Sequence, residues 1–303
     1  MAFVALQPSS AAFFGMILTA VLLFPLSTDP MQAIPEDRRS TWPIRDWEWA
    51  AVRIGSLLLS PVAWIGILLV LRVGWQAGAI ALAGGAAAQG LAILAKRMPG
   101  FSGAWLRFVP APPGAIGAIM RLQWRGMLRT LDPYVALVLS GATTAYMLWG
   151  GPLDAEAPHI MALVVALALS THTQVLLGID GRGAERYLQM PIRGWRILLA
   201  KDLAFLAMVA LVVVPLDFAA GVIGAMAALA LGHHQSVMKQ VAQVPWRFTA
   251  GALFPVGVIQ TIALFAVGNS VRSVGWPIVA GCVAAWMISL WAYGWVWDRR
   301  RVS

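Results

Sequence analysis

The chain has 303 residues, of which 60% are apolar and only 12% are charged, and its mean hydropathy is +0.75. Soluble globular domains are about half apolar and about a quarter charged, so this composition excludes an ordinary soluble domain. The net charge of +9 lies between apolar blocks and not along one face or tail, which argues against nucleic acid as a partner. Cys282 is the only cysteine, which excludes an intramolecular disulfide and a thiolate metal cluster.

The apolar residues form continuous segments that are too uniform for one face of a soluble helix. A helix of about 20 apolar residues crosses a bilayer, and inside lipid every backbone amide must be hydrogen-bonded within the protein. We therefore predict an all-α, polytopic membrane protein with about nine transmembrane helices; eight or ten are the alternatives. The segments are 11–27, 52–71, 75–95, 134–151, 158–178, 202–217, 218–232, 250–268 and 274–297.

The segments 202–217 and 218–232 are shorter than a full span and are joined by a very short turn. We predict that they form a tilted hairpin that enters the bilayer only partway, with Pro215 and Asp217 at its tip. The first segment lacks a basic region before it and a small-residue cleavage site after it, so we expect a retained span and not a signal peptide.

The positions of the basic residues predict an orientation. With the N-terminus outside, 20 of the 22 lysines and arginines fall on the cytoplasmic side or at its membrane edge, and only Arg72 and Arg272 fall outside. Cytoplasmic loops of membrane proteins carry such an excess of positive charge. We therefore expect a multi-pass protein with a cytoplasmic C-terminus. Interfacial tryptophans are expected at Trp276 on the outer side and at Trp295 and Trp297 on the inner side.

An internal repeat divides the chain. Pro43-Ile44-Arg45-Asp46-Trp47 recurs as Pro191-Ile192-Arg193-Gly194-Trp195, 148 positions later. Arg53 lies six residues after the first tryptophan, and Lys201 lies six residues after the second. In each copy an apolar segment precedes the motif and a tight pair of segments follows it. The repeat predicts two related halves, of which the first lacks its opening span.

The second copy carries a family resemblance. The stretch from Gly181 to Lys201 contains Glu185-Arg186-Tyr187-Leu188-Gln189-Met190-Pro191-Ile192-Arg193 and ends in Ala200-Lys201. It resembles the cytoplasmic loop of type-2 ATP-binding-cassette exporter permeases, and the segments between 134 and 297 resemble the six-span unit of that family. The resemblance covers residues 117–297, and it reaches 35–95 only through the repeat.

Residues 119–129, upstream of the six-span unit, resemble the amphipathic elbow helix of the same family. Arg121, Arg125 and Arg129 recur every four residues, while Leu122, Met127 and Leu128 are expected to help form an apolar side. Such a helix suits the surface of an anionic inner leaflet. The chain departs from the family where Gln123-Trp124 replaces Lys-Glu. The predicted regions are an N-terminal partial repeat with three spans (1–100), a cytoplasmic loop with the elbow helix (101–133) and a six-helix permease unit (134–303).

The resemblance implies a permease subunit of an ATP-driven exporter in a bacterial inner membrane. The sequence has no Gly-x-x-x-x-Gly-Lys-[Ser/Thr] loop, so ATP is expected on a separate ATPase subunit, and no enzymatic activity or cofactor is expected in this chain. Expected partners are that ATPase, a second permease copy or homologue, and the lipid bilayer. The implied ATPase-coupling loop comprises Glu185, Arg186, Pro191, Arg193, Trp195 and Lys201, and the repeat-equivalent loop comprises Pro43, Arg45, Trp47 and Arg53. The alternative function is a non-transporting membrane scaffold or assembly subunit derived from such a permease.

A polar cluster inside the segment 158–178 is the candidate substrate pathway. Thr171, His172 and Gln174 lie where polar groups cost free energy unless they find partners. Hydrogen bonding between helices is the competing interpretation. His233 and His234 are adjacent and cannot converge on a metal ion from one helix face, so a helix cap or an interface role is expected for them.

Overall fold

The computed structural model describes residues 45, 48, 111–149, 156–178, 187–239, 249 and 256–300. The chain forms two compact units, Met1–Ala87 and Ala88–Ser303. The labelled helices all belong to the second unit, which therefore contains both the elbow segment and the six-helix region. No β-strand occurs within the described ranges, so the all-α prediction is confirmed for this part of the chain.

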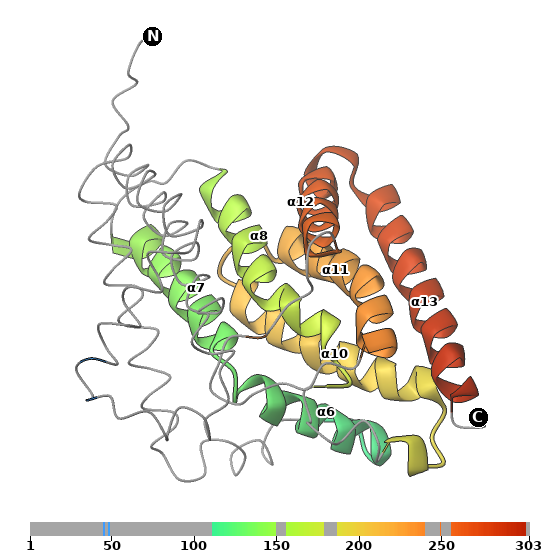
Figure 1. Ribbon diagram of the computed structural model, residues 1–303. Coiled ribbons are helices and arrows are strands. Elements are labelled where there is room, and N and C mark those ends of the chain that lie inside the picture. The colour runs from blue at the N-terminus through green and yellow to red at the C-terminus, as the bar shows by residue number, and fades with distance from the viewer. Residues whose placement is uncertain are drawn as a thin grey trace. The chain divides into compact units, whose positions relative to one another are not determined.

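Each predicted apolar segment from 134 onward contains a described helix, but only α7 and α13 match the predicted ends within two residues, and the other four differ by six to eight residues at one end or both. Pro158 and Pro277 lie in the first turns of their helices, where the missing N–H of proline leaves no hydrogen bond unmade. In chain order the elements are α6 (Ala115–Met127), α7 (Asp132–Trp149), α8 (Ala157–Ser170), the 3-10 helix η4 (Thr171–Gln174), α10 (Gly194–Val213), α11 (Phe218–Lys239), α12 (Val256–Val274) and α13 (Trp276–Arg299) (Figure 1).

Helix α11 is the centre of this unit and packs against α8, η4, α10, α12 and α13. Its glycines permit the close approach. A Cβ atom added at Gly224 would lie 3.1 Å from the carbonyl oxygen of Leu264 on α12. A Cβ atom added at Gly232 would lie 2.7 Å from Cβ of Thr173 on η4. Close packing between helices through small residues is typical of membrane bundles, where the lipid supplies no hydrophobic drive for association.

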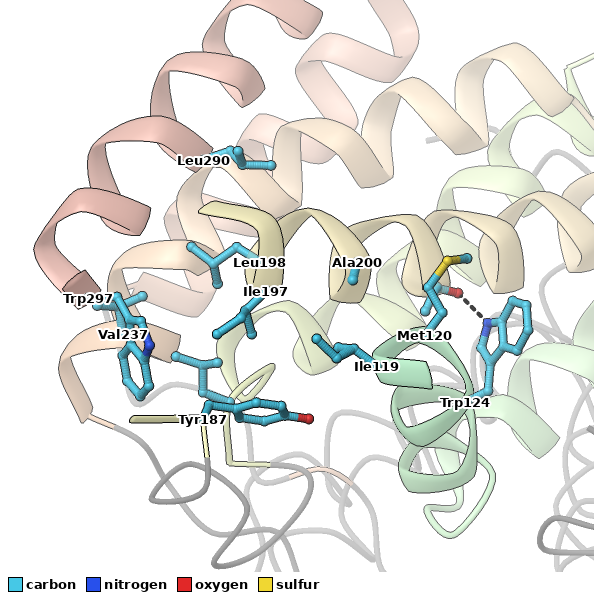
Figure 2. Packing of buried hydrophobic residues seen from close by; sticks show 12 residues of the cluster. Ile119, Met120, Trp124, Tyr187, Ile197, Leu198, Ala200, Val237, Leu290 and Trp297 are labelled. Atoms are coloured by element: carbon cyan, nitrogen blue, oxygen red, sulfur yellow. Dashed lines mark hydrogen bonds between the residues drawn. The ribbon is translucent and has the colours of Figure 1, made fainter. Parts of the chain in front are cut away.

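One hydrophobic cluster joins α6 to the beginning of α10 and the last turns of α13 (Figure 2). Ile119 and Trp124 of α6 pack into it, and Trp124 Nε1 donates a hydrogen bond to the carbonyl oxygen of Ala204 at 2.7 Å. Trp297 is buried there and not interfacial as predicted. These residues define the α6 end of the unit. The opposite end is defined by the α10–α11 turn (214–217), the first turn of α8 and the last turn of α12.

The prediction of a short, partly inserted hairpin is wrong in its helix lengths. Helix α10 has 20 residues and α11 has 22, so each is about 30 Å long at the usual rise of about 1.5 Å per residue. The apolar segments are shorter because Lys201, Asp202 and His233 interrupt the hydrophobic run. These side chains are paired inside the unit, so both helices continue through them. Pro215 and Asp217 do lie in the turn, as predicted.

Within the described ranges, one helix is long and apolar enough to cross a membrane, namely α13 (Trp276–Arg299). Much of its apolar surface is exposed, and the side chain of Trp276 is 79% exposed. Neighbouring α12 also exposes large aliphatic side chains, among them Val258, Ile259 and Ile262. The two helices therefore present apolar surface outward, which in a monomeric soluble protein is rarely extensive.

Candidate functional site

The turn that carries the repeated motif is described from Tyr187 onward. Ile192 donates its backbone N–H to the carbonyl oxygen of Met190 at 2.8 Å, which closes the turn around Pro191. Arg193 then has extended backbone angles and is the N-cap residue of α10. The side chains of Pro191 and Arg193 are exposed, while Tyr187 is buried in the cluster of Figure 2. The turn is therefore anchored at its beginning and presents its proline and arginine outward.

Helix α13 holds the other side of this turn. The carboxylate of Asp298 accepts a hydrogen bond from the backbone N–H of Gly194 at 2.7 Å, at the N-terminus of α10, where a negative charge is favoured. The backbones of the two helices cross closely there. A Cβ atom added at Gly294 would lie 2.6 Å from Cα of Trp195. The motif turn and the end of α13 are thus one packed structure.

Trp195 is half-buried at this crossing and is more than a surface anchor. The guanidinium of Arg196 lies over the indole ring of Trp195, with its central carbon 5.3 Å from the ring centroid. On α13 the guanidinium of Arg299 stacks on Trp295 at 3.5 Å. The α6 end of the unit therefore exposes arginines that are supported by aromatic rings, together with exposed Arg193.

Lys201, predicted to belong to the coupling loop, is fully buried and lies within α10, six residues after Trp195. Its ammonium donates hydrogen bonds to the carbonyl oxygen of Leu176 at 2.7 Å and to Oε1 of Gln123 at 3.0 Å. The same ammonium lies 4.9 Å from the ring centroid of Tyr187. Lys201 therefore connects α6, the segment after η4 and the motif turn, and it presents no charge to a partner.

Helix α6 is amphipathic and lies where the elbow helix was predicted, but it ends at Met127, before Arg129, and its apolar side differs from the expected one. Arg121, Arg125 and Arg129 are all exposed. Ile119, Met120, Trp124 and Met127 form the buried side, whereas Leu122 is 41% exposed and not part of it. The two residues that depart from the family pattern make the key contacts, because Gln123 accepts from Lys201 and Trp124 donates to Ala204.

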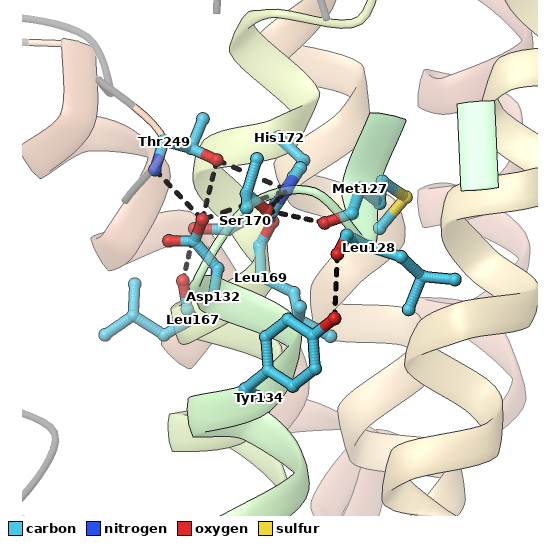
Figure 3. A network of polar contacts seen from close by, with 10 residues as sticks. Met127, Leu128, Asp132, Tyr134, Leu167, Leu169, Ser170, His172 and Thr249 are labelled. Atoms are coloured by element: carbon cyan, nitrogen blue, oxygen red, sulfur yellow. Dashed lines mark hydrogen bonds and ion pairs between the residues drawn. The ribbon is translucent and has the colours of Figure 1, made fainter. Parts of the chain in front are cut away.

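The candidate pathway residues lie beyond the end of α8, in η4, and are mostly hydrogen-bonded to other elements. His172 is fully buried, with its Nε2 atom 2.9 Å from Oγ1 of Thr130 and 3.2 Å from Oγ1 of Thr249 (Figure 3). Asp132 accepts from both the backbone N–H and the hydroxyl of Thr249, at 2.9 and 2.7 Å. This network ties the start of α7 to the end of α8.

Gln174 and Thr171 differ in their surroundings. Gln174 donates through its Nε2 atom to Oε1 of Gln260, which lies on α12. The Nε2 atom of Gln260 in turn donates to Thr173 Oγ1 and, at 3.0 Å, to the carbonyl oxygen of Ala228 on α11. Thr171 Oγ1 is buried without a hydrogen-bond partner among the described residues. The contacts of His172 and Gln174 therefore favour interhelical hydrogen bonding over a pathway lined by free polar groups.

A second polar cluster lies at the opposite end and includes Arg272, one of the two basic residues predicted outside. Arg272 donates to Asp217 and to Glu156, both at 2.9 Å. His159 bridges Asp217 and Asn269 through its two ring nitrogens, at 2.9 and 2.8 Å. Burial acts to raise the pKa of Asp217, but the hydrogen bonds from His159, from the Ala220 N–H and from Arg272 outweigh it and lower that pKa. This cluster joins α8, the α10–α11 turn and α12.

Sequence reasoning missed Asp202, whose partner is His233. Both side chains are 0% exposed, and His233 Nε2 lies 3.0 Å from Oδ2 of Asp202. Trp286 of α13 also donates to Asp202, at 2.8 Å. The hydrophobic run predicts a segment that begins at residue 202 and so places this carboxylate at a span end, whereas it lies inside α10. The signal that predicts the pair is an acid on one arm of the hairpin and a histidine on the other.

Several predicted residues lie outside the described residues: Glu185, Arg186, Pro43, Trp47 and Arg53. Of the repeat-equivalent loop the structure describes Arg45, which is exposed and whose backbone N–H donates to the carboxylate of Glu48 at 2.9 Å.

In comparisons with known proteins, no family model, curated protein or solved structure matches the chain.

Proposed function

We propose that this chain is the multi-pass permease subunit of an ATP-driven exporter, with the ATPase on a separate polypeptide. The proposal rests on the resemblance of residues 117–297 to type-2 ATP-binding-cassette permeases. The observation that carries it is the motif turn, because it is anchored on both sides and exposes its proline and arginine. A rigid turn with an exposed cation and a half-buried aromatic residue has the features of an interface hot spot.

The contacts that connect the motif turn to α6, α10 and α13 support its assignment as the ATPase-coupling loop. The turn is capped by Asp298 of α13 and is continuous with α10, while Lys201 connects α10 to α6. A force applied at Pro191 and Arg193 therefore reaches α6, α10 and α13 together. ATP-driven closure of a bound ATPase would tilt these helices as one rigid body.

The proposed membrane placement accounts for the two ends of the unit. The α6 end carries the exposed Arg121, Arg125, Arg129, Arg193 and Arg196, which suits the cytoplasmic side. At the opposite end, Arg272 is the exception to the charge bias and is paired there with Asp217 and Glu156. The exposed apolar surface of α12 and α13 then faces lipid or a second permease subunit.

The test is photo-crosslinking in native membranes from a reactive amino acid placed at position 193. We expect the chain to be crosslinked to a soluble ATPase, because this side chain is exposed at the anchored turn. A reactive residue placed at position 122 of α6 is the matched control, since Leu122 is also exposed at the same end but outside the turn. Crosslinks from 193 to lipid alone would contradict the coupling assignment and favour the scaffold function.

A further inference from the structure

We propose that Asp202, His233 and Ser289 form a buried proton-binding site that locks α13 onto α10 and α11. The inference does not depend on the proposed function, because it follows from the donors and acceptors around one imidazole ring. Asp202 lies on α10, His233 on α11 and Ser289 on α13. Asp202 and His233 are both 0% exposed, and Ser289 is half-buried.

The orientation of the ring is determined by its partners. His233 Nδ1 lies 2.9 Å from Oγ of Ser289, and Nε2 lies 3.0 and 3.1 Å from the two carboxylate oxygens of Asp202. A flipped ring would place carbon atoms against these oxygens. The Nδ1 atom therefore faces Ser289 and the Nε2 atom faces Asp202. Each of these two contacts needs one proton, because two lone pairs at hydrogen-bond distance would repel each other.

The proton between Ser289 and His233 belongs to the imidazole. Ser289 Oγ lies 2.6 Å from the carbonyl oxygen of Ala230, and a carbonyl can only accept, so the single hydroxyl proton is committed there. Ser289 then has only lone pairs to offer His233, and Nδ1 carries the proton. The order of groups is that of a serine hydrolase triad, but the hydroxyl is not aimed at the histidine as a nucleophile's would be.

A second proton lies between Nε2 and the carboxylate of Asp202, whichever of the two atoms holds it. The other donor to Asp202 is Trp286 Nε1, at 2.8 Å. The pair thus binds two protons and has no net charge. Full burial favours a pair with no net charge, because an uncompensated charge away from water is strongly unfavourable.

Loss of the Nδ1 proton to water changes both charge and contacts. The pair becomes neutral imidazole and carboxylate, with a net charge of −1, and Nδ1 becomes an acceptor. Ser289 must then rotate its hydroxyl proton from Ala230 to His233, which removes a hydrogen bond between α13 and the backbone of α11. The bound proton therefore strengthens the attachment of α13.

Other titratable side chains lie on the helices around this site. Tyr293 of α13 approaches His233 with ring centroids 6.4 Å apart, and His234 contacts the Tyr293 hydroxyl at 3.1 Å. Lys201 of α10 is directed to Gln123 and Leu176. The titratable groups on the other packed elements are engaged elsewhere: His159 of α8 and Arg272 of α12 bind Asp217, and His172 of η4 contacts Thr130 and Thr249.

The first test is nuclear magnetic resonance of the full-length chain in lipid nanodiscs with ¹⁵N-labelled histidine, assigned by loss of the signal in His233→Gln. We expect Nδ1 of His233 to carry a proton at neutral pH. A bare Nδ1 with the proton on Nε2 would overturn the proposal. In Ser289→Ala, which removes the hydrogen-bond acceptor, we expect the chemical shift of Nδ1 to change, and an unchanged shift would also contradict the site.

The second test measures whether the site holds α13 against α11. Spin labels at exposed Met238 on α11 and Trp295 on α13, in a Cys282→Ser background, report the distance between the two helices. We expect Ser289→Ala to broaden the distance distribution. Ser273→Ala, the same substitution at an exposed position of α12 whose hydroxyl bonds within its own helix, is the matched control and should change nothing. An unchanged distribution in Ser289→Ala would show that the site does not hold α13.

Discussion

At the residue scale, the buried side chains Lys201 and Asp202 each contact specific polar groups inside the unit. Lys201 donates to two oxygens and lies over an aromatic ring, with 0% of the residue exposed. Removal of one member of such a set leaves the other polar groups buried without a partner. The resulting loss of stability is larger than the net contribution of the hydrogen bond itself. Buried lysine in α10 is therefore a structural requirement for the attachment of α6.

Replacing Lys201 by Met should lower the free energy of unfolding by about 2–3 kcal/mol, because the carbonyl of Leu176 and the amide of Gln123 lose a charged donor. Denaturant titration in micelles, followed by tryptophan fluorescence, measures the change. Lys239→Met, at an exposed position of α11, is the control and should be nearly neutral. Equal effects of the two substitutions would show that Lys201 is not the connection.

Asp217 predicts a pH dependence whose sign follows from its lowered pKa. A carboxyl group with a folded pKa below its unfolded value of about 3.8 stabilises the fold above that value. This stability is lost as the pH falls through the folded pKa. In Asp217→Asn the thermal midpoint should be lower at neutral pH and should fall less on acidification than in the parent. Glu156→Gln, whose carboxylate is mostly exposed, is the control and should lower the thermal midpoint at neutral pH by less than Asp217→Asn.

At the element scale, the crossing of α10 and α13 places the motif turn. The two helices approach so closely at Gly194 and Gly294 that neither position has room for a side chain. The hydrogen bond from Gly194 to Asp298 fixes the register of the crossing. Any movement of the turn therefore has to move the end of α13.

Gly294→Ala should separate the two helices, because the new methyl group would lie 2.6 Å from the backbone of Trp195. We expect a loss of about 1–3 kcal/mol in stability, as for other overpacked contacts. The matched control is Gly281→Ala in the same helix, where a Cβ atom would meet nothing within 4 Å. Thermal unfolding of both variants in nanodiscs checks this, and a Gly294→Ala protein as stable as Gly281→Ala would contradict the crossing.

Helix positions in the described unit were predictable from hydrophobic runs, but helix ends were not. Lys201 and Asp202 resemble a boundary in sequence, yet they are paired within α10, and His233 is paired within α11. Such pairs join residues 31 to 78 positions apart. Local composition cannot identify them. The exposed Pro191 and Arg193 were predictable, whereas the burial of Trp297 was not, because it depends on the glycine crossing.

At the scale of the whole molecule, the proposed orientation places the α6 end in the cytoplasm and the Arg272 cluster outside. Both ends can be labelled after Cys282 is replaced by Ser. A cysteine at exposed Ser273 should react with an impermeant maleimide in intact cells, and a cysteine at Arg193 only after permeabilisation. Labelling of both positions from the same side would exclude this orientation.

The central claim is that the chain works with a separate ATPase, and co-purification from the native membrane in mild detergent tests it most directly. We predict a soluble ATPase in stoichiometric amount, reduced several-fold by Arg193→Ala with Trp195→Ala and retained in Arg121→Ala. Membrane insertion of the double variant, checked by membrane fractionation, should be unchanged. Recovery of the intact chain without any ATPase would contradict the permease assignment and favour a membrane scaffold.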